Sequence, residues 1–370
     1  MRTARVALVT ALLISCSAPA STPSPSTSAA SASASATAPP SATSDPSRYG
    51  VLLQAPGRIF VRRERTLSDV VLEIGGERPA ASHDGRHIAL WRTGTQRNNP
   101  QELYIVDVVG GAERMLTGLP AAAAGGPIVW ANDDSGLLWE VHSTEYFAGI
   151  GGGPKFSRLE SKELSDSAFP PGSTHSELML NSGAWFVPLA WDKSGAMASA
   201  LITGEGGMTG QYVTWDRRAP QAGQSAVKRA SMQWPSTAFS VRASHDGKLM
   251  LAIDIAANAL RVWPTGDIGG STLVRPASGM LTDARWRSGT ARDIAWVAGT
   301  NVELFTYGTS AVGTIYRGQS APFIQGWRAD GSAIYLFESA RGTFVVDLAS
   351  LSQTVIWPED LAVIGGMILR

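Results

Sequence analysis

From Tyr49 to the end of the chain, the hydrophobic residues gather in short runs of five to eight positions. Glycine, aspartate, serine and asparagine separate these runs. No stretch in this part shows the sustained 3.6-residue periodicity of an amphipathic helix. Short apolar runs bounded by turn residues are typical of strands. The pattern therefore predicts an all-β fold for residues 49–370.

One turn recurs along this pattern. Ser-His-Asp-Gly occurs at 82–85 and at 244–247, and an apolar run follows each copy. Looser copies share the glycine and a preceding aspartate or serine. The turn glycines lie 42 to 59 residues apart, and they are Gly85, Gly136, Gly195, Gly247, Gly289 and Gly331. Because a four-stranded propeller blade has about 40 to 50 residues, the spacing predicts one blade for each glycine.

Each turn has a chemistry suited to a corner between two strands. An aspartate there can accept a hydrogen bond from the backbone ahead of it, and glycine can adopt the positive φ that closes the corner. Four of the preceding strands end in tryptophan, namely Trp130, Trp191, Trp286 and Trp327. We expect these indoles to fill the space between neighbouring blades, with the indole N–H on a carbonyl.

The two ends of this region complete the number of blades. Three strands at 49–54, 57–62 and 69–74 precede the first turn glycine, and one apolar strand at 361–369 is left over at the C-terminus. Together they make a seventh blade, which ties the termini together and leaves no open sheet edge. We therefore predict a seven-bladed β-propeller of four-stranded blades, closed by the C-terminal strand. The longer intervals, after Gly136 and Gly195, hold insertions that we expect to be loops.

The repeated corner resembles that of TolB-type, WD-like bacterial β-propellers. Their corner reads Ser-Pro-Asp-Gly, and His83 and His245 stand at the usual proline position. The resemblance covers residues 49–370 and implies the propeller architecture. It implies little about function, because propellers host many unrelated activities.

The N-terminus, residues 1–15, resembles the signal peptide of a bacterial lipoprotein. Two arginines precede an apolar segment at 6–14, which is too short to span a bilayer. It leads into Leu-Ile-Ser-Cys, ending at Cys16. The resemblance implies cleavage before Cys16, acylation of that residue, and a protein anchored by lipid to the extracytoplasmic face of the cell membrane. The alternative is an ordinary secretory peptide with a chance cysteine.

Residues 16–48 contain this cysteine and a linker. The linker consists of serine, alanine, threonine and proline up to residue 47, apart from Asp45. It has no large apolar side chain to bury, so we expect a disordered tether between the membrane and the propeller. Cys16 is the only cysteine, which excludes a disulfide framework.

Charge and composition exclude several partners. The chain has 31 basic and 31 acidic side chains, so no general basic field indicates nucleic-acid binding. A single cysteine is insufficient for a Cys/His zinc site. His83 and His87 have i, i+4 spacing, but they fall on a turn and a strand rather than on a helix. We expect a monomer with no cofactor, no metal and no nucleic-acid partner.

No catalytic set stands out in the sequence. It contains neither a Gly-x-Ser-x-Gly elbow nor an added α/β domain. The glycine-rich stretch 149–155 lacks the Gly-Lys-Ser/Thr ending of a phosphate loop, so we interpret it as a hairpin insertion. Asp133-Asp134 and the charged run 62–65 are interpreted as exposed strand or turn charges.

The inner strands should line the central channel and offer the remaining candidates. They carry Arg78, Arg242, Asp283, Arg285 and Gln325, with Asp283 the only carboxylate among them. A single acid does not make the carboxylate pair of a glycosidase. The residues are either solvated and mutually paired, or they form a cationic channel mouth that binds an acidic group. For such binding we select Arg242, Asp283 and Arg285.

Two functions remain. The first is a non-catalytic module of the cell envelope, whose propeller rim binds a protein or a glycan. The second is a lactonase- or glycosidase-like hydrolase with its site at the channel mouth. Clustered carboxylates would favour the enzyme, and a shallow rim with exposed aromatics would favour the binding module. In either case, function must lie in what differs between the blades: the insertions and the inner-strand charges.

Overall fold

The computed structural model describes residues 46–66, 68–94, 100–148, 152–165, 175–195, 197–204, 210–217, 227–232, 240–276, 279–357 and 362–369. Cys16 and almost all of the predicted linker lie outside the described residues. Within these ranges the helices are short 3-10 turns, η1 (Pro46–Arg48) and η4 (Ile268–Gly270). Neither the length nor the hydropathy of any described helix suffices to cross a bilayer.

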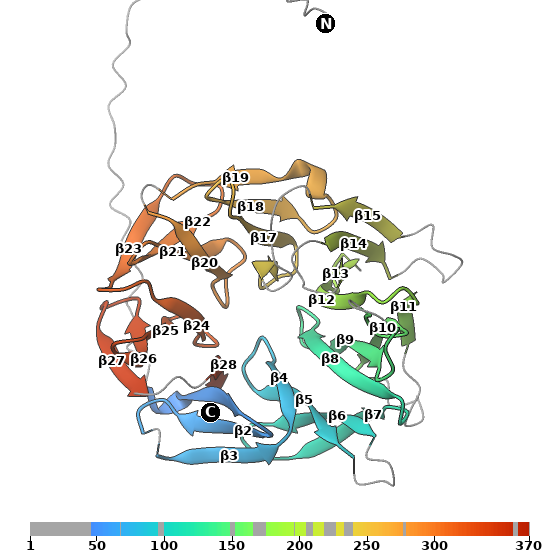
Figure 1. Cartoon of the computed structure of the whole chain (residues 1–370). Helices are drawn as coiled ribbons and strands as arrows, with labels where there is room; N and C mark the ends of the chain where they lie inside the picture. Colours follow the sequence, from blue (N-terminus) through green and yellow to red (C-terminus); the bar gives the residue numbers. More distant parts are fainter. Residues whose placement is uncertain are drawn as a thin grey trace, which may run out of the picture. The chain divides into compact units, whose positions relative to one another are not determined.

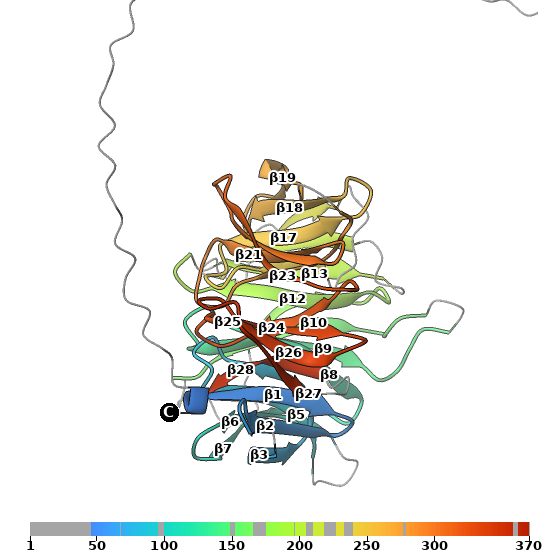
Figure 2. The same cartoon turned by 90° about the vertical axis from the view of Figure 1, so that its left-hand side faces the viewer.

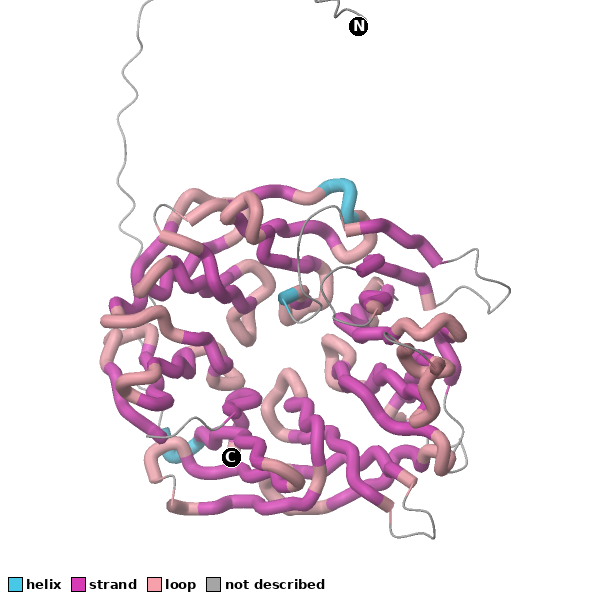
Figure 3. Tube along the Cα trace, in the orientation of Figure 1, coloured by secondary structure: helices cyan, strands magenta, loops and turns pink. Residues whose placement is uncertain are grey.

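The described strands form seven four-stranded antiparallel sheets, which stand as blades in a ring (Figure 1). Loops and turns connect them, and helical segments are scarce (Figure 3). Blades 1 to 6 follow the six turn glycines in order, each written from its inner strand outward. Blade 1 has β4 (Glu77–Ala81), β5 (His87–Thr93), β6 (Gln101–Asp107) and β7 (Glu113–Gly118). Blade 2 has β8 (Ala123–Trp130), β9 (Gly136–Ser143), β10 (Ser157–Glu163) and β11 (His175–Leu180). Blade 3 has β12 (Trp185–Asp192), β13 (Met197–Thr203), β14 (Gly210–Asp216) and β15 (Val227–Ser231).

The remaining anchored blades repeat the plan. Blade 4 has β16 (Arg242–Ala243), β17 (Leu249–Asp254), β18 (Ala259–Pro264) and β19 (Thr272–Val274). Blade 5 has β20 (Leu281–Trp286), β21 (Asp293–Ala298), β22 (Asn301–Thr306) and β23 (Val312–Arg317). Blade 6 has β24 (Phe323–Trp327), β25 (Ala333–Glu338), β26 (Gly342–Asp347) and β27 (Gln353–Trp357).

The seventh sheet, the closing blade, joins the two ends of the propeller. Its inner strand is β28 (Ala362–Ile368), followed outward by β1 (Tyr49–Ala55), β2 (Arg58–Arg63) and β3 (Val70–Gly75). Figure 2 shows β1 beside β28, where Gly50 pairs with Met367 and Leu52 with Gly365. The structure thus confirms the seven-bladed propeller and its closure by the C-terminal strand.

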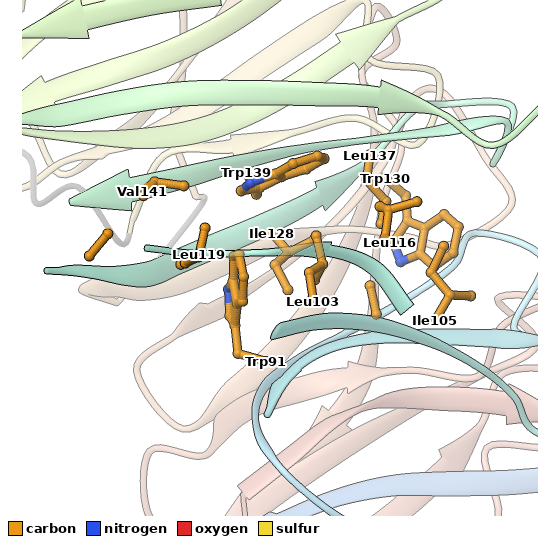
Figure 4. Close-up of a cluster of buried hydrophobic side chains, with 12 residues drawn as sticks. Trp91, Leu103, Ile105, Leu116, Leu119, Ile128, Trp130, Leu137, Trp139 and Val141 are labelled. Atoms are coloured by element: carbon orange, nitrogen blue, oxygen red, sulfur yellow. The ribbon is translucent and has the colours of Figure 1, made fainter. Parts of the chain in front are cut away.

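The hydrophobic core is divided among the interfaces between neighbouring blades. Between blades 1 and 2, Trp91 and Trp139 are fully buried together with Leu103 and Leu137 (Figure 4). A cluster of the same kind occupies each of the other interfaces. Because a single twisted sheet cannot bury both of its faces alone, this shared burial holds each blade in the ring.

The four predicted tryptophans all lie in these interfaces. The indole N–H of Trp130 donates to the carbonyl of Ala80 at 2.9 Å. That of Trp286 donates to the carbonyl of Arg242 at 3.1 Å. Trp327 departs from the prediction, since its buried Nε1 has no hydrogen-bond partner in the described part of the chain.

The corners after the inner strands have the predicted hydrogen bonds. Oδ1 of Asp246, for example, accepts from the backbone N of Lys248 at 3.1 Å. Gly136 and Gly195 depart from the prediction, because neither has a positive φ; in the corner of Gly136, Asp134 takes the left-handed conformation instead, at φ 58°. A Cβ on Gly136 would lie 2.6 Å from the ring of Trp191, so this glycine serves close packing. Positive φ of 69° to 71° occurs, as predicted, at Gly85, Gly247, Gly289 and Gly331.

A buried polar contact reinforces the join between the closing blade and blade 6. Glu64 is only 4% exposed, so the prediction of exposed charges at 62–65 is wrong for this residue. Its carboxylate accepts hydrogen bonds from Nε of Arg328 at 2.9 Å and from the hydroxyl of Tyr335 at 2.7 Å. Arg328 lies 264 positions further along the chain, so no local pattern announces the pair.

Candidate functional site

The three residues selected from the sequence come together in the central channel. Arg242 lies in β16 and Arg285 in β20, which are adjacent inner strands. Asp283 precedes Arg285 by two positions, so both side chains leave the same side of β20. The charges of Arg242 and Asp283 both act on the guanidinium of Arg285. The site therefore holds two cations and one anion.

The carboxylate of Asp283 is engaged by backbone rather than by the arginines. Its Oδ2 accepts from the backbone N of Ile324 at 3.0 Å, and its Oδ1 accepts from that of Ala284 at 2.9 Å. Nη1 of Arg285 donates to the carbonyl of Gln325 at 3.0 Å. The Nε atoms of Arg242 and Arg285 are both buried, and neither has a hydrogen-bond partner among the described residues.

The surroundings of the two arginines disfavour their positive charges. Burial, and then repulsion from Arg242, lowers the pKa of Arg285 to about 10, although Asp283 acts in the opposite direction. Burial also lowers the pKa of Arg242, again against Asp283. Removing a cation from water is costly unless it is paired. A carboxylate or phosphate accepts two parallel hydrogen bonds from a guanidinium, so an acidic group would relieve both residues.

Two histidine-bearing corners meet at the end of the channel where the inner strands finish. The rings of His83 and His245 stack edge to face, with centroids 4.9 Å apart. Nδ1 of His83 lies 2.8 Å from Oδ1 of Asp134, in the corner of blade 2. Burial alone would raise the pKa of Asp134, but hydrogen bonds from the side chain and backbone of His83 hold that pKa below its usual value. Asp134 is therefore not the exposed charge predicted from the sequence.

A small cavity of about 230 Å³ lies among these corners. His83, Asn132 and His245 contribute to its wall. So do Ala243 and Trp286, the residues that directly follow Arg242 and Arg285. The arginines and the histidine corners thus belong to the same end of the channel.

Arg78 and Gln325, the other predicted channel residues, play different parts. The side-chain Oε1 of Gln325 accepts from Thr343 at 3.0 Å, and its carbonyl receives Arg285. Arg78 lies at the start of β4, where Nη1 donates to the carbonyl of Gly125. Two further carboxylates lie on inner strands, Glu77 at the start of β4 and Asp192 at the end of β12, and they accept hydrogen bonds from Gln101 and from Asn132.

Sequence reasoning missed a larger cavity, of about 960 Å³, at the end of the channel where the inner strands begin. Its wall includes Glu140, His142, Tyr146 and Trp185. In sequence, His142 has no notable neighbours. Alternation along β9 was the available signal, since Glu140 and His142 are two positions apart and so share one face of that strand.

A metal centre is not formed by the residues described. No group of three or more histidine, cysteine, aspartate or glutamate side chains comes together among them to hold an ion. His83 and His87 have different partners, Asp134 at 2.8 Å and Asp84 at 3.9 Å. Glu359 and Asp360, which precede the closing strand, lie outside the described residues.

No family model matches the sequence, and no curated protein matches it. Solved structures do match the fold. A functionally unknown protein from Desulfotomaculum acetoxidans aligns with a TM-score of 0.55 at 12% identity, over 87% of this chain and 99% of that one. A chain from work on two prolyl endopeptidases aligns with a TM-score of 0.53 at 12% identity, over 87% of this chain and 50% of that one.

TolB from Acinetobacter baumannii aligns with a TM-score of 0.42 at 16% identity, over 70% of this chain. This chain spans 60% of the TolB chain and half of the prolyl endopeptidase chain. At such low identity, the likeness to solved structures concerns the propeller fold alone.

Proposed function

We propose that this protein is a lipoprotein of the bacterial cell envelope, anchored through Cys16 to the extracytoplasmic face of the cell membrane. The Leu-Ile-Ser-Cys sequence after a short apolar segment supports the anchor. Several acyl chains on one cysteine hold a protein stably at a membrane, whereas one chain is marginal. The linker at 16–48 then separates the propeller from the bilayer.

The propeller acts in this proposal as a non-catalytic module that binds a protein or glycan partner through an acidic group. The observation that carries the idea is the pair of half-buried arginines, Arg242 and Arg285, whose buried Nε atoms have no hydrogen-bond partner among the described residues. Asp283 supplies one negative charge against two positive ones, and its carboxylate accepts hydrogen bonds from backbone N–H groups rather than from either guanidinium. A carboxylate or phosphate from the partner supplies the missing acceptor.

The test measures how much of the soluble Cys16→Ser protein is retained by isolated cell envelopes. Adding Arg285→Gln should reduce retention about tenfold or more, because one partner of a charge-assisted contact is lost. Arg58→Gln is the control, since Arg58 is an exposed arginine whose side chain is 67% accessible. Equal retention of all three proteins would refute binding at the arginine pair.

A hydrolase at the channel mouth is the second candidate, and one observation favours it. Nδ1 of His142 lies 2.9 Å from the buried carboxylate of Glu140, an arrangement in which an imidazole can act as a general base. The test is turnover of aryl lactones and aryl glycosides by the wild-type protein and by His142→Ala. Turnover by the wild-type protein that is lost in His142→Ala would show that the protein is a hydrolase and not a non-catalytic binding module.

A further inference from the structure

The larger cavity, of about 960 Å³, has two aromatic walls set at an angle. Trp185 is the first residue of β12, and Tyr146 lies in the connection between β9 and β10. Their ring centroids are 6.5 Å apart and their planes meet at 63°. Tyr146 is 50% exposed. Both side chains thus line the cavity rather than packing away into the core.

A contact between two glycines brings these walls together from different blades. The connection between β9 and β10 folds back as a hairpin, in which the backbone N of Phe147 donates to the carbonyl of Gly153 at 3.0 Å. A Cβ on Gly153 would lie 1.7 Å from the carbonyl oxygen of Gly183, shortly before β12. Only glycine allows this approach. The predicted insertion after Gly136 is therefore pinned against the start of blade 3.

The end of β13 lines the same cavity. Thr203 is the last residue of β13, and both Thr203 and Gly204 contribute to the wall. Residues of blade 3 and of the connection between β9 and β10 thus meet at one pocket. This convergence is what a binding site built on a repetitive scaffold requires.

A buried carboxylate and an imidazole form the polar part of the pocket. The side chain of Glu140 is 1% exposed. Oε1 accepts from the hydroxyl of Ser157 at 2.7 Å, and Oε2 lies 2.9 Å from Nδ1 of His142. In the tautomer whose Nδ1–H donates to this carboxylate, Nε2 of His142 is an acceptor for a ligand.

The charges around the pocket favour a neutral ligand. Glu140 is already bonded on both oxygens, so it offers little to a cation. Arg78 is the basic residue in the wall, and its guanidinium is tied to the carbonyl of Gly125. Glu140 and Arg78 thus give the wall one negative and one positive side chain, which offset each other, so the pocket has no net charge from them to compensate a buried ammonium or carboxylate.

We propose that this pocket binds a neutral saccharide. A sugar ring has apolar C–H faces, which pack on the aromatic rings of Tyr146 and Trp185. Its hydroxyls donate and accept at once, which suits Nε2 of His142 and the polar groups of Thr203 and Gln54. The volume accommodates more than one sugar unit. The proposal goes beyond the acidic-group site, because Arg242 and Arg285 do not line this pocket.

Saturation-transfer NMR on the full chain tests the proposal with cellobiose and N,N′-diacetylchitobiose at about 10 mM. Deacetylated chitobiose and cellobiuronic acid serve as charged counterparts. We expect transfer to a neutral disaccharide and little to either charged one. Tyr146→Ala should weaken the Kd about tenfold, in line with the loss of one aromatic contact. His142→Ala should weaken it as well.

Phe323→Ala is the matched control, because Phe323 is an aromatic residue, 61% exposed, that lies outside the pocket. Its Kd should equal that of the wild type. If neither neutral disaccharide shows saturation transfer, or if Tyr146→Ala binds as tightly as the wild type, the proposal of a saccharide site is wrong. Cleavage of a bound disaccharide would retain the site and instead overturn the non-catalytic function. Loss of envelope retention in Arg285→Gln leaves this result unaffected, so the two proposals fail separately.

Discussion

The imidazole ring of His83 meets that of His245 edge to face, with centroids 4.9 Å apart and planes at 89°. The two residues occupy equivalent corners of blades 1 and 4, which are not neighbours in the ring. Asp134 of blade 2 holds His83, and Asn132 of the same blade donates to the carbonyl of Asp246 at 3.1 Å. Copies of one repeated turn therefore link three blades at one end of the channel.

This contact predicts that stability falls on mild acidification. Burial, and then the proximity of His83, lowers the pKa of His245, while Asp134 and Asp246 act in the opposite direction. The unfolded chain, with a histidine pKa of about 6.5, then binds more protons than the folded one as pH falls. The stabilisation linked to neutral His245 is fully present above about pH 7, and it is lost as the pH drops through the pKa of His245 in the folded protein.

Urea unfolding at about pH 7.5 and about pH 5.5 measures this effect. His245→Asn should shrink the difference between the two midpoints, because the titrating ring is gone. Asp134 causes a separate loss of stability only below about pH 4. Its pKa is lower in the folded protein than in the unfolded chain, so its ionised form stabilises the fold at any pH above the pKa of the unfolded chain. An identical pH dependence in His245→Asn would show that the ring is not responsible.

A second prediction concerns the join between the closing blade and blade 6. Glu64→Ala leaves the guanidinium of Arg328, whose side chain is 7% exposed, without its main partner. Removing one partner of a buried ion pair costs about 3–5 kcal/mol, and Arg328 keeps a contact with Asp347 at 3.4 Å, so the free energy of unfolding should fall toward the lower end of that range. Glu73→Ala breaks the exposed pair with Arg58 and should change it by less than about 0.5 kcal/mol. Similar losses in both variants would contradict the buried role of Glu64.

A third prediction tests closure by the C-terminal strand. Deleting residues 361–370 removes the inner strand of the closing blade and should lower the Tm markedly, because β1 keeps β2 as a neighbour but loses β28 and becomes an open sheet edge. Gly366→Val is the subtler variant, since a Cβ there would lie 2.6 Å from Cα of Arg328. It should cost about 2 kcal/mol or more through overpacking.

Gly313→Val is the control for Gly366, because a Cβ at Gly313 has no heavy atom within 4 Å. Its Tm should remain close to that of the wild type. If the deletion leaves the Tm unchanged, the pairing of β1 with β28 does not hold the ring together.

A fourth prediction concerns the anchor. If Cys16 is the acylated residue, as proposed, Cys16→Ser removes the sulfur that would receive the lipid, and the protein should move from the membrane fraction to the soluble fraction. Fractionation of cells followed by immunoblotting measures the distribution. Ser15→Ala retains the small residue before the cysteine and should stay with the membrane. Membrane association of Cys16→Ser as strong as that of the wild type would exclude the lipid anchor.

The fold was largely predictable because each blade repeats one local pattern. Turn glycines at regular intervals give the number of blades, and unmatched strands at the two ends give the closure. Local patterns also placed Arg242, Asp283 and Arg285 on inner strands. They could not show that the backbone engages Asp283, because that depends on Ile324 of the next blade.

Contacts between different blades escaped prediction for the same reason. Glu64 reads as one charge in a polar run, yet its partners are Arg328 and Tyr335. In the sequence, His83 and His245 occupy equivalent corner positions. They come into contact only through the arrangement of the blades in the propeller. The saccharide pocket depends on the backbone approach of Gly153 to Gly183, which no periodicity encodes.

Photo-crosslinking in intact cells tests whether a partner in the cell envelope binds at Arg242 and Arg285. A photoreactive amino acid replaces Ser288, which lines the cavity at the arginine end of the channel, or Val355, which is exposed on β27. We predict a discrete envelope adduct from position 288, lost when Arg285→Gln is added and absent from position 355. No adduct at 288, or one that persists with Arg285→Gln, would contradict binding of an envelope partner at the arginine pair.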